Sequence, residues 1–419
     1  MDLVIVPDLL YDGTGNGANH GYAVALNNGS IVEVAPKNLL LGHVPATTRI
    51  ITYEGCTLLP GLIDAHVHLG WGLPEQSGWA RVSGTPEGRF AWSLAGAQAA
   101  LSVGVTTQRD CGAPDFGILR LRDVIKAGLV VGPTILASGP CITTTGGHGD
   151  FIGVTADSAP DIRKRVRELC RAGVDFIKVM ASGGDIDPRS NRRHPQYSLE
   201  EMCALVGDAH RLSLPVVAHC NPTAAIRQAV TAGVDTIAHC NWLGEKDGTI
   251  DYNADVADQL LASGTFIDLN VGPTIAPYAV GDGKKQQWPT DFGPANRWEL
   301  HKNLRERGAK ILLTSDAFGP DTAGFPSLLA RMVTELGLDV AEVVHRATEV
   351  PAHAIGRGHE VGVIAEGYTA DLALFDGNLE DNPSVFDKAR HVWSAGRLVS
   401  SRGRLHLSSR TRTSDDIHV

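Results

Sequence analysis

The chain has 419 residues and a formal net charge of −10 at pH 7. This surplus of negative charge argues against nucleic acid and anionic membranes as the main partners, because both present repelling phosphate groups. A composition of 43% hydrophobic and 20% charged residues, without a run of about 18 apolar residues, indicates a globular protein with a large core.

Two further features bear on the compartment of the protein. The opening stretch MDLVIVPDLL lacks the basic start of a signal peptide, so we expect a cytoplasmic protein. The seven cysteines are odd in number and include no CxxC pair, so we expect reduced thiols and no disulfide framework.

The two ends of the chain have a pattern different from that of the middle. Residues 1–56 alternate short apolar runs with turn residues, which is typical of β-strands, and residues 361–405 do the same. We expect these two segments to pair as one small β-sandwich domain. The polar stretch 406–419 is expected to form a mobile tail.

Between the ends, residues 57–360 repeat apolar runs at intervals of a few tens of residues. Continuous apolar character is typical of strands that are covered on both faces, as in parallel sheets. We expect strands within eight such runs, at 58–70, 104–110, 134–139, 175–184, 215–220, 235–240, 265–271 and 310–317.

The segments between these runs have the signals of amphipathic helices. Ser198 and Glu201 have the spacing of a capping box, and two further segments run into Gly173 and Gly233, where a helix is expected to end. The similar segments AGVDFIK and AGVDTIAH indicate that a helix-to-strand unit is repeated. Eight alternating strand–helix units predict an α/β fold, a (β/α)8 TIM barrel over residues 57–360.

Polar residues that can bind a metal stand at the carboxyl ends of the expected strands. His66 and His68 are separated by one residue, so their side chains point to the same face of the first strand. A lone histidine in such a place is usually a hydrogen-bonded core residue, but six suitable residues at corresponding ends would converge at the face where barrel active sites lie. The six residues are His66, His68, Lys178, His219, His239 and Asp316.

Lys178 is the most informative of the six, because a charged amine inside an apolar strand is costly unless it is paired or neutral. One interpretation is an ion pair with a carboxylate such as Asp316. The other is that the neutral amine has captured carbon dioxide, and that the resulting carbamate bridges two cations. His66, His68 and Asp316 would then hold one ion, and His219 with His239 the second; nitrogen and oxygen ligands with an open position suit zinc.

Taken in order, these motifs resemble the amidohydrolase superfamily, and the resemblance covers nearly the whole chain, including the split terminal domain. Within the superfamily the chain is similar to the binuclear-metal, prolidase-like branch, which cleaves Xaa-Pro dipeptides and N-acyl amino acids. Relatives of that branch also hydrolyse ochratoxin, phenylureas and thiocarbamates. The motifs are PGLIDAHVHLG, GVTTQRDCG, FIKVMASGG, VVAHC, IAHC and TSDA.

The resemblance implies a mechanism and a set of catalytic residues. Two divalent cations would lower the pKa of a water molecule between them. Asp316 would accept the proton of this water and return it to the leaving amine. His148, in the loop TTTGGHGDF, matches a position where the branch keeps a histidine that stabilises the carbonyl oxygen; the alternative is an ordinary loop histidine.

Substrate contacts are implied more weakly. The resemblance points to Tyr197 as a contact of the substrate carboxylate, assisted by Arg192 or Arg193, although a basic loop is more often only solvated. Arg109 and Asp110 match a family pair that a structural salt bridge would explain equally well. For two further groups we expect packing roles: the cysteines that follow ligand histidines (Cys220 and Cys240) and the tryptophans after the first strand (Trp71, Trp79 and Trp92), which could otherwise line an apolar pocket.

The resemblance implies a metal-dependent hydrolase of small-molecule amides. A dipeptide or an N-acyl amino acid is the first choice of substrate, and a xenobiotic amide, urea, carbamate or ochratoxin-like substrate is the alternative. A mononuclear deaminase on the same barrel is a rival, but that chemistry usually places a glutamate where Asn221 stands. A scaffold without activity is a second rival, although such proteins typically lose ligands. Homo-oligomers are common among relatives, so the resemblance also implies a homo-oligomer.

Overall fold

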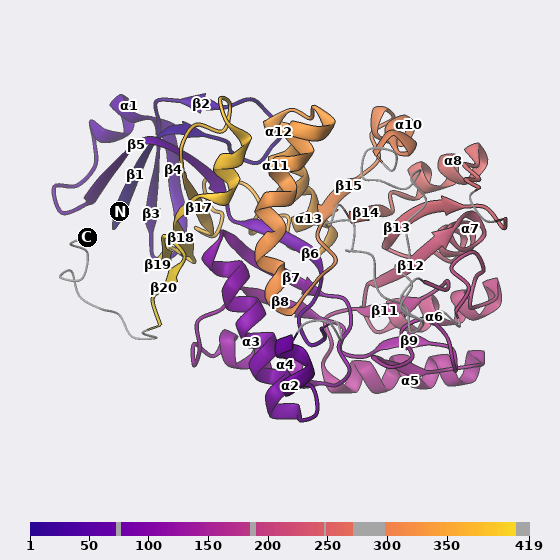
Figure 1. Ribbon diagram of the computed structural model, residues 1–419. Helices are drawn as coiled ribbons and strands as arrows, with labels where there is room; N and C mark the ends of the chain where they lie inside the picture. Colours follow the sequence, from indigo (N-terminus) through magenta and orange to yellow (C-terminus); the bar gives the residue numbers. More distant parts are fainter. Residues whose placement is uncertain (73–76, 185–189, 247–248, 271–297, 408–419) are drawn as a thin grey trace.

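The computed structural model of the protein describes residues 1–72, 77–184, 190–246, 249–270 and 298–407 (Figure 1). The expected tail, 406–419, lies almost entirely outside the described residues. No helix in the described part of the chain combines the length and the apolar character that crossing a bilayer requires.

The two ends of the chain pair with each other in one sheet (Figure 1). Within the described residues this sheet has nine strands, in the order β20-β19-β18-β17-β5-β1-β3-β4, with β2 beside β1. The junction between the two ends is the antiparallel pairing of β5 with β17, in which Leu58 lies opposite Leu374. The strands are β1 Leu3–Leu10, β2 Asn19–His20, β3 Tyr22–Asn27, β4 Ser30–Pro36, β5 Arg49–Pro60, β17 Leu372–Asp376, β18 Ala389–Ser394, β19 Arg397–Ser401 and β20 Arg404–Leu405.

Burial on both faces explains the apolar runs of this terminal sheet. In β1, Ile5 packs in one hydrophobic cluster together with Leu58 and Trp393, whereas Val4 and Val6 pack in another on the opposite face. The short helices that accompany the sheet are α1 Lys37–Leu41 and the 3-10 helix η3 Pro383–Asp387.

The middle of the chain forms parallel sheets, as predicted, and each of the eight expected runs contains a strand. In the described residues one sheet has the order β10-β9-β11-β12-β13-β14-β15 and another the order β16-β6-β7-β8. The eight expected strands are β6 Leu62–His68, β7 Val105–Asp110, β8 Thr134–Ala137, β11 Ile177–Met180, β12 Val216–Pro222, β13 Thr236–Leu243, β14 Phe266–Asn270 and β15 Ile311–Thr314, and the short strands that were not expected are β9 Cys141–Thr143, β10 Gly153–Thr155 and β16 Ala317–Phe318.

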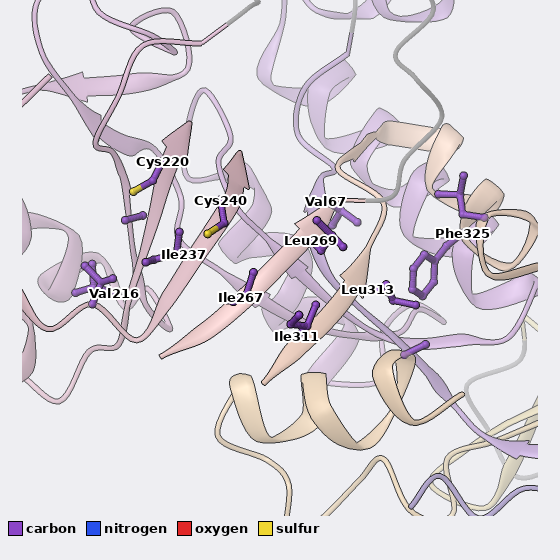
Figure 2. Packing of buried hydrophobic residues seen from close by; sticks show 14 of the residues in the cluster. Val67, Val216, Cys220, Ile237, Cys240, Ile267, Leu269, Ile311, Leu313 and Phe325 are labelled. Atoms are coloured by element: carbon purple, nitrogen blue, oxygen red, sulfur yellow. The ribbon is translucent and has the colours of Figure 1, made fainter. Parts of the chain in front are cut away.

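The step from β15 to β16 brings the last expected strand back to the first. β16 follows β15 after two residues and pairs in parallel with β6, placing Phe318 opposite His68. As a result, the residues that follow β15 lie beside the carboxyl end of β6. On the opposite face of β6, β14 and β15, buried side chains such as Val67, Leu269 and Leu313 pack in one hydrophobic cluster that also includes Phe325 of the covering helices (Figure 2).

The connecting helices begin and end at the signals that the sequence contains. Ser198 and Glu201 form a complete capping box at the start of α6, and Gly173 and Gly233 end their helices with left-handed backbone conformations. The helices of this part are α2 Ser77–Val82, α3 Pro86–Ser102, α4 Gly117–Lys126, α5 Ala159–Ala172, α6 Leu199–Arg211, α7 Thr223–Ala232, α8 Ala254–Ser263, α10 Lys302–Glu306, the 3-10 helix η2 Gly319–Gly324, α11 Phe325–Leu336, α12 Val340–Ala347 and α13 Glu349–Ala354.

Gly61 joins the terminal sheet to the parallel strands, between the end of β5 and the start of β6. Its N–H donates to the carbonyl of Asp371, at 2.8 Å. A Cβ atom at this position would lie 2.1 Å from Oγ1 of the buried Thr106 on β7. The absence of a side chain therefore lets the chain pass between the two sheets at close range.

We expect Gly61→Ala to destabilise the protein by about 1–3 kcal/mol, because the stiff Thr106 side chain cannot withdraw from the added methyl group. Gly207→Ala is the matched control: Gly207 is an exposed interior position of α6 with open space around its Cβ position. This control should stabilise the protein by about 0.5–1 kcal/mol. Denaturant unfolding measures both changes, and equal midpoints for the two variants would contradict the packing argument.

Candidate metal centre

The six residues that were expected to converge stand at the carboxyl ends of parallel strands. His66 and His68 lie at the end of β6, Lys178 in β11, His219 in β12 and His239 in β13. The sixth residue, Asp316, lies between β15 and β16, two residues after the end of β15. These strands belong to two parallel sheets, and the short connection from β15 to β16, which pairs with β6, brings the two sheets together at the site.

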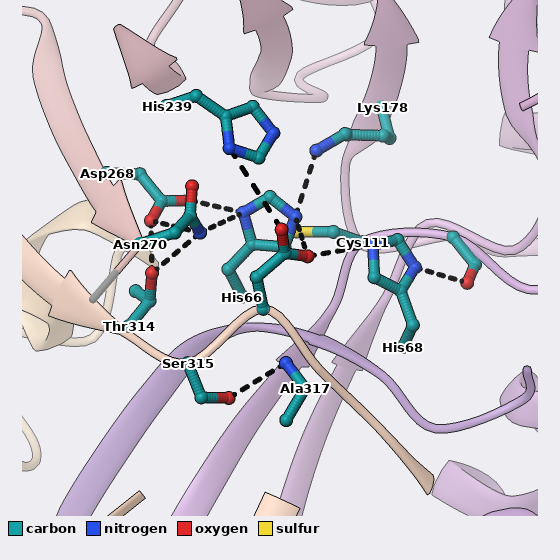
Figure 3. Close-up of polar contacts among 12 residues, drawn as sticks. His66, His68, Cys111, Lys178, His239, Asp268, Asn270, Thr314, Ser315 and Ala317 are labelled. Carbon is teal, nitrogen blue, oxygen red and sulfur yellow. Dashed lines mark hydrogen bonds and ion pairs between the residues drawn. The ribbon is translucent and has the colours of Figure 1, made fainter. Parts of the chain in front are cut away.

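His66, His68 and Asp316 form a compact group of metal-binding atoms. Figure 3 shows the two imidazoles of this group. One ligand atom from each of the three lies within 4.8 Å of the others. Oδ1 of Asp316 is 3.5 Å from Nε2 of His66 and 3.4 Å from Nε2 of His68. Two imidazole nitrogens and a carboxylate oxygen are a donor set that suits zinc and similar divalent cations.

The backbone at Asp316 holds its carboxylate toward the two imidazoles. Its φ of +55° lies in the left-handed region, which residues other than glycine seldom adopt, and its N–H donates to the carbonyl of His66 at 2.9 Å. Burial alone would raise the pKa of Asp316, but its neighbours His66, His68 and Lys178, including a hydrogen bond from His68, lower it to about 2. The group is therefore a carboxylate at neutral pH.

Lys178 is almost completely buried, with 1% of its surface exposed. Its Nζ lies 3.2 Å from Nε2 of His66. Within the described residues no ion pair joins Lys178 to Asp316, so the ion-pair interpretation of this lysine is not supported. Burial, followed by the charge of Lys178, lowers the pKa of His66 well below its usual value, which keeps this imidazole neutral.

Three further histidines, His148, His219 and His239, lie together next to the group formed by His66, His68 and Asp316. The ring centroids of His219 and His239 are 4.4 Å apart, and those of His148 and His219 are 4.6 Å apart. His239 also approaches the first group, since its Nδ1 is 4.0 Å from Oδ2 of Asp316. Burial and the neighbouring histidines lower the pKa of His219 well below its usual value. All six expected ligands, and His148 with them, are therefore linked by short contacts.

Asp268 and Asn270 of β14 belong to this site, although the sequence analysis did not single them out. Oδ2 of Asp268 accepts from Nδ1 of His66 at 2.6 Å, and Thr314 donates to the other carboxylate oxygen (Figure 3). Burial raises the pKa of Asp268 to about 6, while the nearby Arg109 opposes this shift. The sequence does contain a signal for these two residues, because Asp268 and Asn270 alternate with apolar residues inside a buried strand.

The bond from Asp268 also sets the tautomer of His66. When Nδ1 carries the proton and donates it to the carboxylate, Nε2 is left with a lone pair that faces Lys178 and Asp316. A metal ion can bind only such an unprotonated nitrogen. Arg109 lies next to Asp268: its guanidinium is 3.9 Å from the carboxylate of Asp268, and its Nε donates to the carbonyl of Ala65. This agrees with the structural role considered for Arg109.

Asn221 and Asn241 form a series of amide contacts beside His219. The amide of Asn241 donates to Oδ1 of Asn221 at 2.6 Å, and the amide of Asn221 lies 2.9 Å from Nε2 of His219. Asn221 also donates to the carbonyl of Gly183 at 3.1 Å. The residue that stands where a deaminase would usually carry a glutamate is thus a hydrogen-bond donor beside His219.

The residues expected to contact substrate have contacts of their own. Tyr197 is 4% exposed, and its hydroxyl donates to the carbonyl of Ala156. Arg193 is buried and donates to the carbonyls of Gly244 and Thr249, whereas Arg192 is half-buried. These contacts account for Tyr197 and Arg193 as parts of the folded chain, and the substrate-binding roles of Tyr197, Arg192 and Arg193 stay predictions.

The cysteines and tryptophans of the site region have packing roles, as expected. Cys220 and Cys240 are fully buried in the hydrophobic cluster that the strands form with the helices (Figure 2). Trp71 and Trp79 are buried in one apolar cluster, with Trp92 packed against it. This cluster also contains Phe318, so it borders the strand pair that carries His68.

We expect Asp268→Ala to weaken the binding of zinc by about 10- to 100-fold, because Nδ1 of His66 loses its partner and the ring is no longer oriented. Competition with a chromogenic chelator measures this affinity without reference to any reaction. Asp208→Ala, which removes a buried carboxylate of α6 that pairs with Arg167, controls for the general loss of a buried charge. Equal zinc affinity in Asp268→Ala and the unmodified chain would contradict the orienting role.

Comparisons with known proteins agree with this arrangement. The chain is 27% identical over 388 residues to ochratoxinase from Aspergillus niger, covering 84% of this chain and 77% of that protein. A solved prolidase in complex with N-methylphosphonate-L-proline is 28% identical, with a TM-score of 0.77, covering 95% of this chain and 99% of the other. A Xaa-Pro dipeptidase with methionine bound in its active site has a TM-score of 0.80 at 23% identity, covers 94% and 99%, and supports the fold alone.

The family model known as the Amidohydrolase family matches residues 57–399, which is most of the chain. The match includes all six residues of the site and the strands β17 and β18 of the terminal sheet. The resemblance found in the sequence is thereby confirmed at the level of the family. The protein is a hydrolase that acts on C–N bonds, and it belongs to the Amidohydrolase family.

Proposed function

We propose that the protein hydrolyses the amide bond of a dipeptide or an N-acyl amino acid with the help of two divalent cations. The observation that carries the proposal is the group formed by His66, His68 and Asp316, with ligand atoms within 4.8 Å of one another and with the buried amine of Lys178 beside it. The similarity to a prolidase in complex with an N-methylphosphonate-L-proline supports the choice of substrate class.

The residues present fit two cations. His66, His68 and Asp316 would hold the first, and His219 with His239 the second, since all offer the nitrogen and oxygen donors that zinc prefers. Lys178 lies between hydrophobic strands next to a neutral imidazole, where an ammonium group is poorly solvated. Reaction of its neutral amine with carbon dioxide would form a carbamate and release a proton, which converts the lysine into an anionic ligand. When bound, the cations would supply positive charge that acidifies water.

The protein groups around the cations have roles of their own. Asp316, a carboxylate at neutral pH, would accept a proton from the attacking water and later donate it to the leaving amine. His148, whose ring lies 4.6 Å from that of His219, would donate a hydrogen bond to the carbonyl oxygen as negative charge develops there. Tyr197, Arg192 and Arg193 remain proposed contacts of the substrate carboxylate, and each would require the loop after β11 to expose it.

Of two other candidate functions, only one has an observation in its favour. The similarity to ochratoxinase and the aromatic cluster around Trp71 favour a xenobiotic amide, urea or carbamate as the alternative substrate. A mononuclear deaminase is less well supported, because Asn221 stands where its glutamate would be and because it has no use for a lysine at position 178.

The proposal extends to the architecture. The pairing of β16 with β6 supports closure of the parallel strands into a (β/α)8 barrel over residues 57–360. The pairing of β17 with β5 in one sheet supports a terminal domain formed by residues 1–56 and 361–405, and its expected sandwich form stays a prediction. A homo-oligomer and a cytoplasmic location stay expectations that rest on the sequence.

We expect the zinc-reconstituted protein to contain about two ions per chain and Lys178→Ala about one, as measured by elemental analysis. Because the carbamate needs carbon dioxide, bicarbonate should speed zinc uptake by the metal-free protein and leave uptake by Lys178→Ala unchanged. Lys126→Ala, an exposed lysine of α4, is the control. A content of about one ion that Lys178→Ala does not alter would favour the mononuclear alternative.

We expect turnover in a library of dipeptides and N-acyl amino acids, and a loss of kcat of about 10²- to 10⁴-fold in Asp316→Asn, which cannot accept the proton. Asp258→Asn, on the surface of α8, is the control. Turnover confined to neutral anilides or carbamates would reject the first choice of substrate. Full activity of Asp316→Asn would reject the mechanism.

A further inference from the structure

Gln196 links the loop that carries His148 to the end of β11. Its Oε1 accepts from the backbone N–H of His148 at 2.6 Å, and its Nε2 donates to the carbonyl of Met180 at 2.7 Å. Met180 is the last residue of β11 and lies two positions after Lys178. A single side-chain amide therefore joins the loop between β9 and β10 to the strand that carries a proposed metal ligand.

Thr143, the last residue of β9, holds the other side of the same backbone. Its hydroxyl donates to the carbonyl of His148 at 2.7 Å, and the hydroxyl oxygen accepts from Nε2 of Gln196 at 3.2 Å. Gln196 is anchored in turn, because its own N–H donates to the carbonyl of Ala181 at 2.8 Å. The N–H and the carbonyl of His148 are thus both engaged by side chains that also bond to each other.

Two glycines let this arrangement form at close range. A Cβ atom on Gly184 would lie 2.3 Å from the ring of His148, and one on Gly147 would lie 2.7 Å from Oε1 of Gln196. The ring of His148 thus lies against bare backbone, with its centroid 4.6 Å from that of His219. The bond to Gln196 fixes the backbone from which this ring projects, and the neighbouring backbone and ring fix where it lies.

A glutamine that bonds to backbone groups can serve only the stability of a loop. Gln196 differs from that case in the residue that it holds, because any movement of the His148 backbone also moves the ring. An amide suits the position, since its oxygen can accept from the N–H of His148 while its nitrogen donates to the carbonyl of Met180. A shift of about 1 Å in a group that contacts the reacting atoms can reduce a rate by about 100-fold.

We propose that Gln196 is a positioning residue of the reaction, which holds the ring of His148 where the carbonyl oxygen of the substrate gains negative charge. This proposal rests on the proposed function, in which His148 donates a hydrogen bond to that oxygen. Because this bond strengthens only as the charge develops, loss of Gln196 lowers kcat more than it raises KM.

The test asks whether Gln196 acts through His148. Gln196→Met keeps the length of the side chain, removes its hydrogen bonds, and should lower kcat for a hydrolysed N-acyl amino acid by about tenfold to 100-fold. In His148→Ala the same substitution should lower kcat by less than about twofold, because no ring is left to position. An equal loss in both backgrounds, or no loss in Gln196→Met, would overturn the positioning role.

A second variant and a matched control accompany this experiment. Thr143→Val removes the hydroxyl that donates to the carbonyl of His148, and should also lower kcat more than it raises KM. Gln98→Met is the control, because Gln98 is another half-buried glutamine whose Nε2 donates to a backbone carbonyl, that of Val131. Gln98 lies on α3 and contacts no residue of the site, so Gln98→Met should leave kcat unchanged.

A binding measurement separates this proposal from the proposed reaction. The zinc-loaded protein is titrated calorimetrically with N-methylphosphonyl-L-alanine, whose anionic oxygens resemble the charge that forms on the carbonyl oxygen. Gln196→Met should weaken this binding by about threefold to tenfold, and should weaken it no further in His148→Ala. This result without turnover of any dipeptide or N-acyl amino acid would support the positioning role and reject the proposed reaction. Binding that Gln196→Met leaves unchanged would overturn the positioning role even if N-acyl amino acids are hydrolysed.

Discussion

The carboxylate of Asp268 holds the Nδ1 edge of His66 at 2.6 Å, and the rest of the site is arranged around the imidazole that this bond orients. With Nδ1 engaged, Nε2 faces both the amine of Lys178 and the carboxylate of Asp316. The backbone carbonyl of His66 accepts from the N–H of Asp316 as well, which ties the segment after β15 to the end of β6. The side chain and the backbone of His66 thus connect β6 with β14 and with the segment that follows β15.

Burial disfavours the charged form of each carboxylate in the site, so hydrogen bonds within the site must stabilise these carboxylates. Asp64, two residues before His66, shows how this is done. Burial raises its pKa to about 7, and hydrogen bonds from the N–H and hydroxyl of Ser315 and from the N–H of His66 oppose that shift. Ser315 directly precedes Asp316, so the same contacts that satisfy Asp64 also position the neighbouring carboxylate.

The backbone conformation at the site is unusual as well. His239, Cys240 and Trp242 in β13 have positive φ angles, as does Asp316. Residues other than glycine are strained in this region, and such strain persists where the surrounding structure enforces it. Here the strain concentrates on two segments that carry proposed ligands. The parallel strands provide a rigid support, while the short irregular segments after them direct the side chains.

The sequence by itself determined the local parts of this protein. Apolar runs predicted all eight strands, the two histidines of HVH were placed on one face by strand periodicity, and the capping box at Ser198 and the helix-ending glycines were found where expected. Such features depend on residues that are near one another in the chain. The order of the motifs was sufficient to identify the family.

Tertiary structure decided what the strands bring together. Asp268 contacts His66 across 202 positions of sequence. The rings of Trp71, Phe151 and Phe318 come together from three segments whose proximity no periodicity reveals. The pairing of β5 with β17 fixes how the chain ends meet, which a pattern of alternating residues cannot specify. The physical reason is the same in each case: spacing along a strand determines the face that a side chain occupies, but only packing determines which side chain from another strand lies opposite.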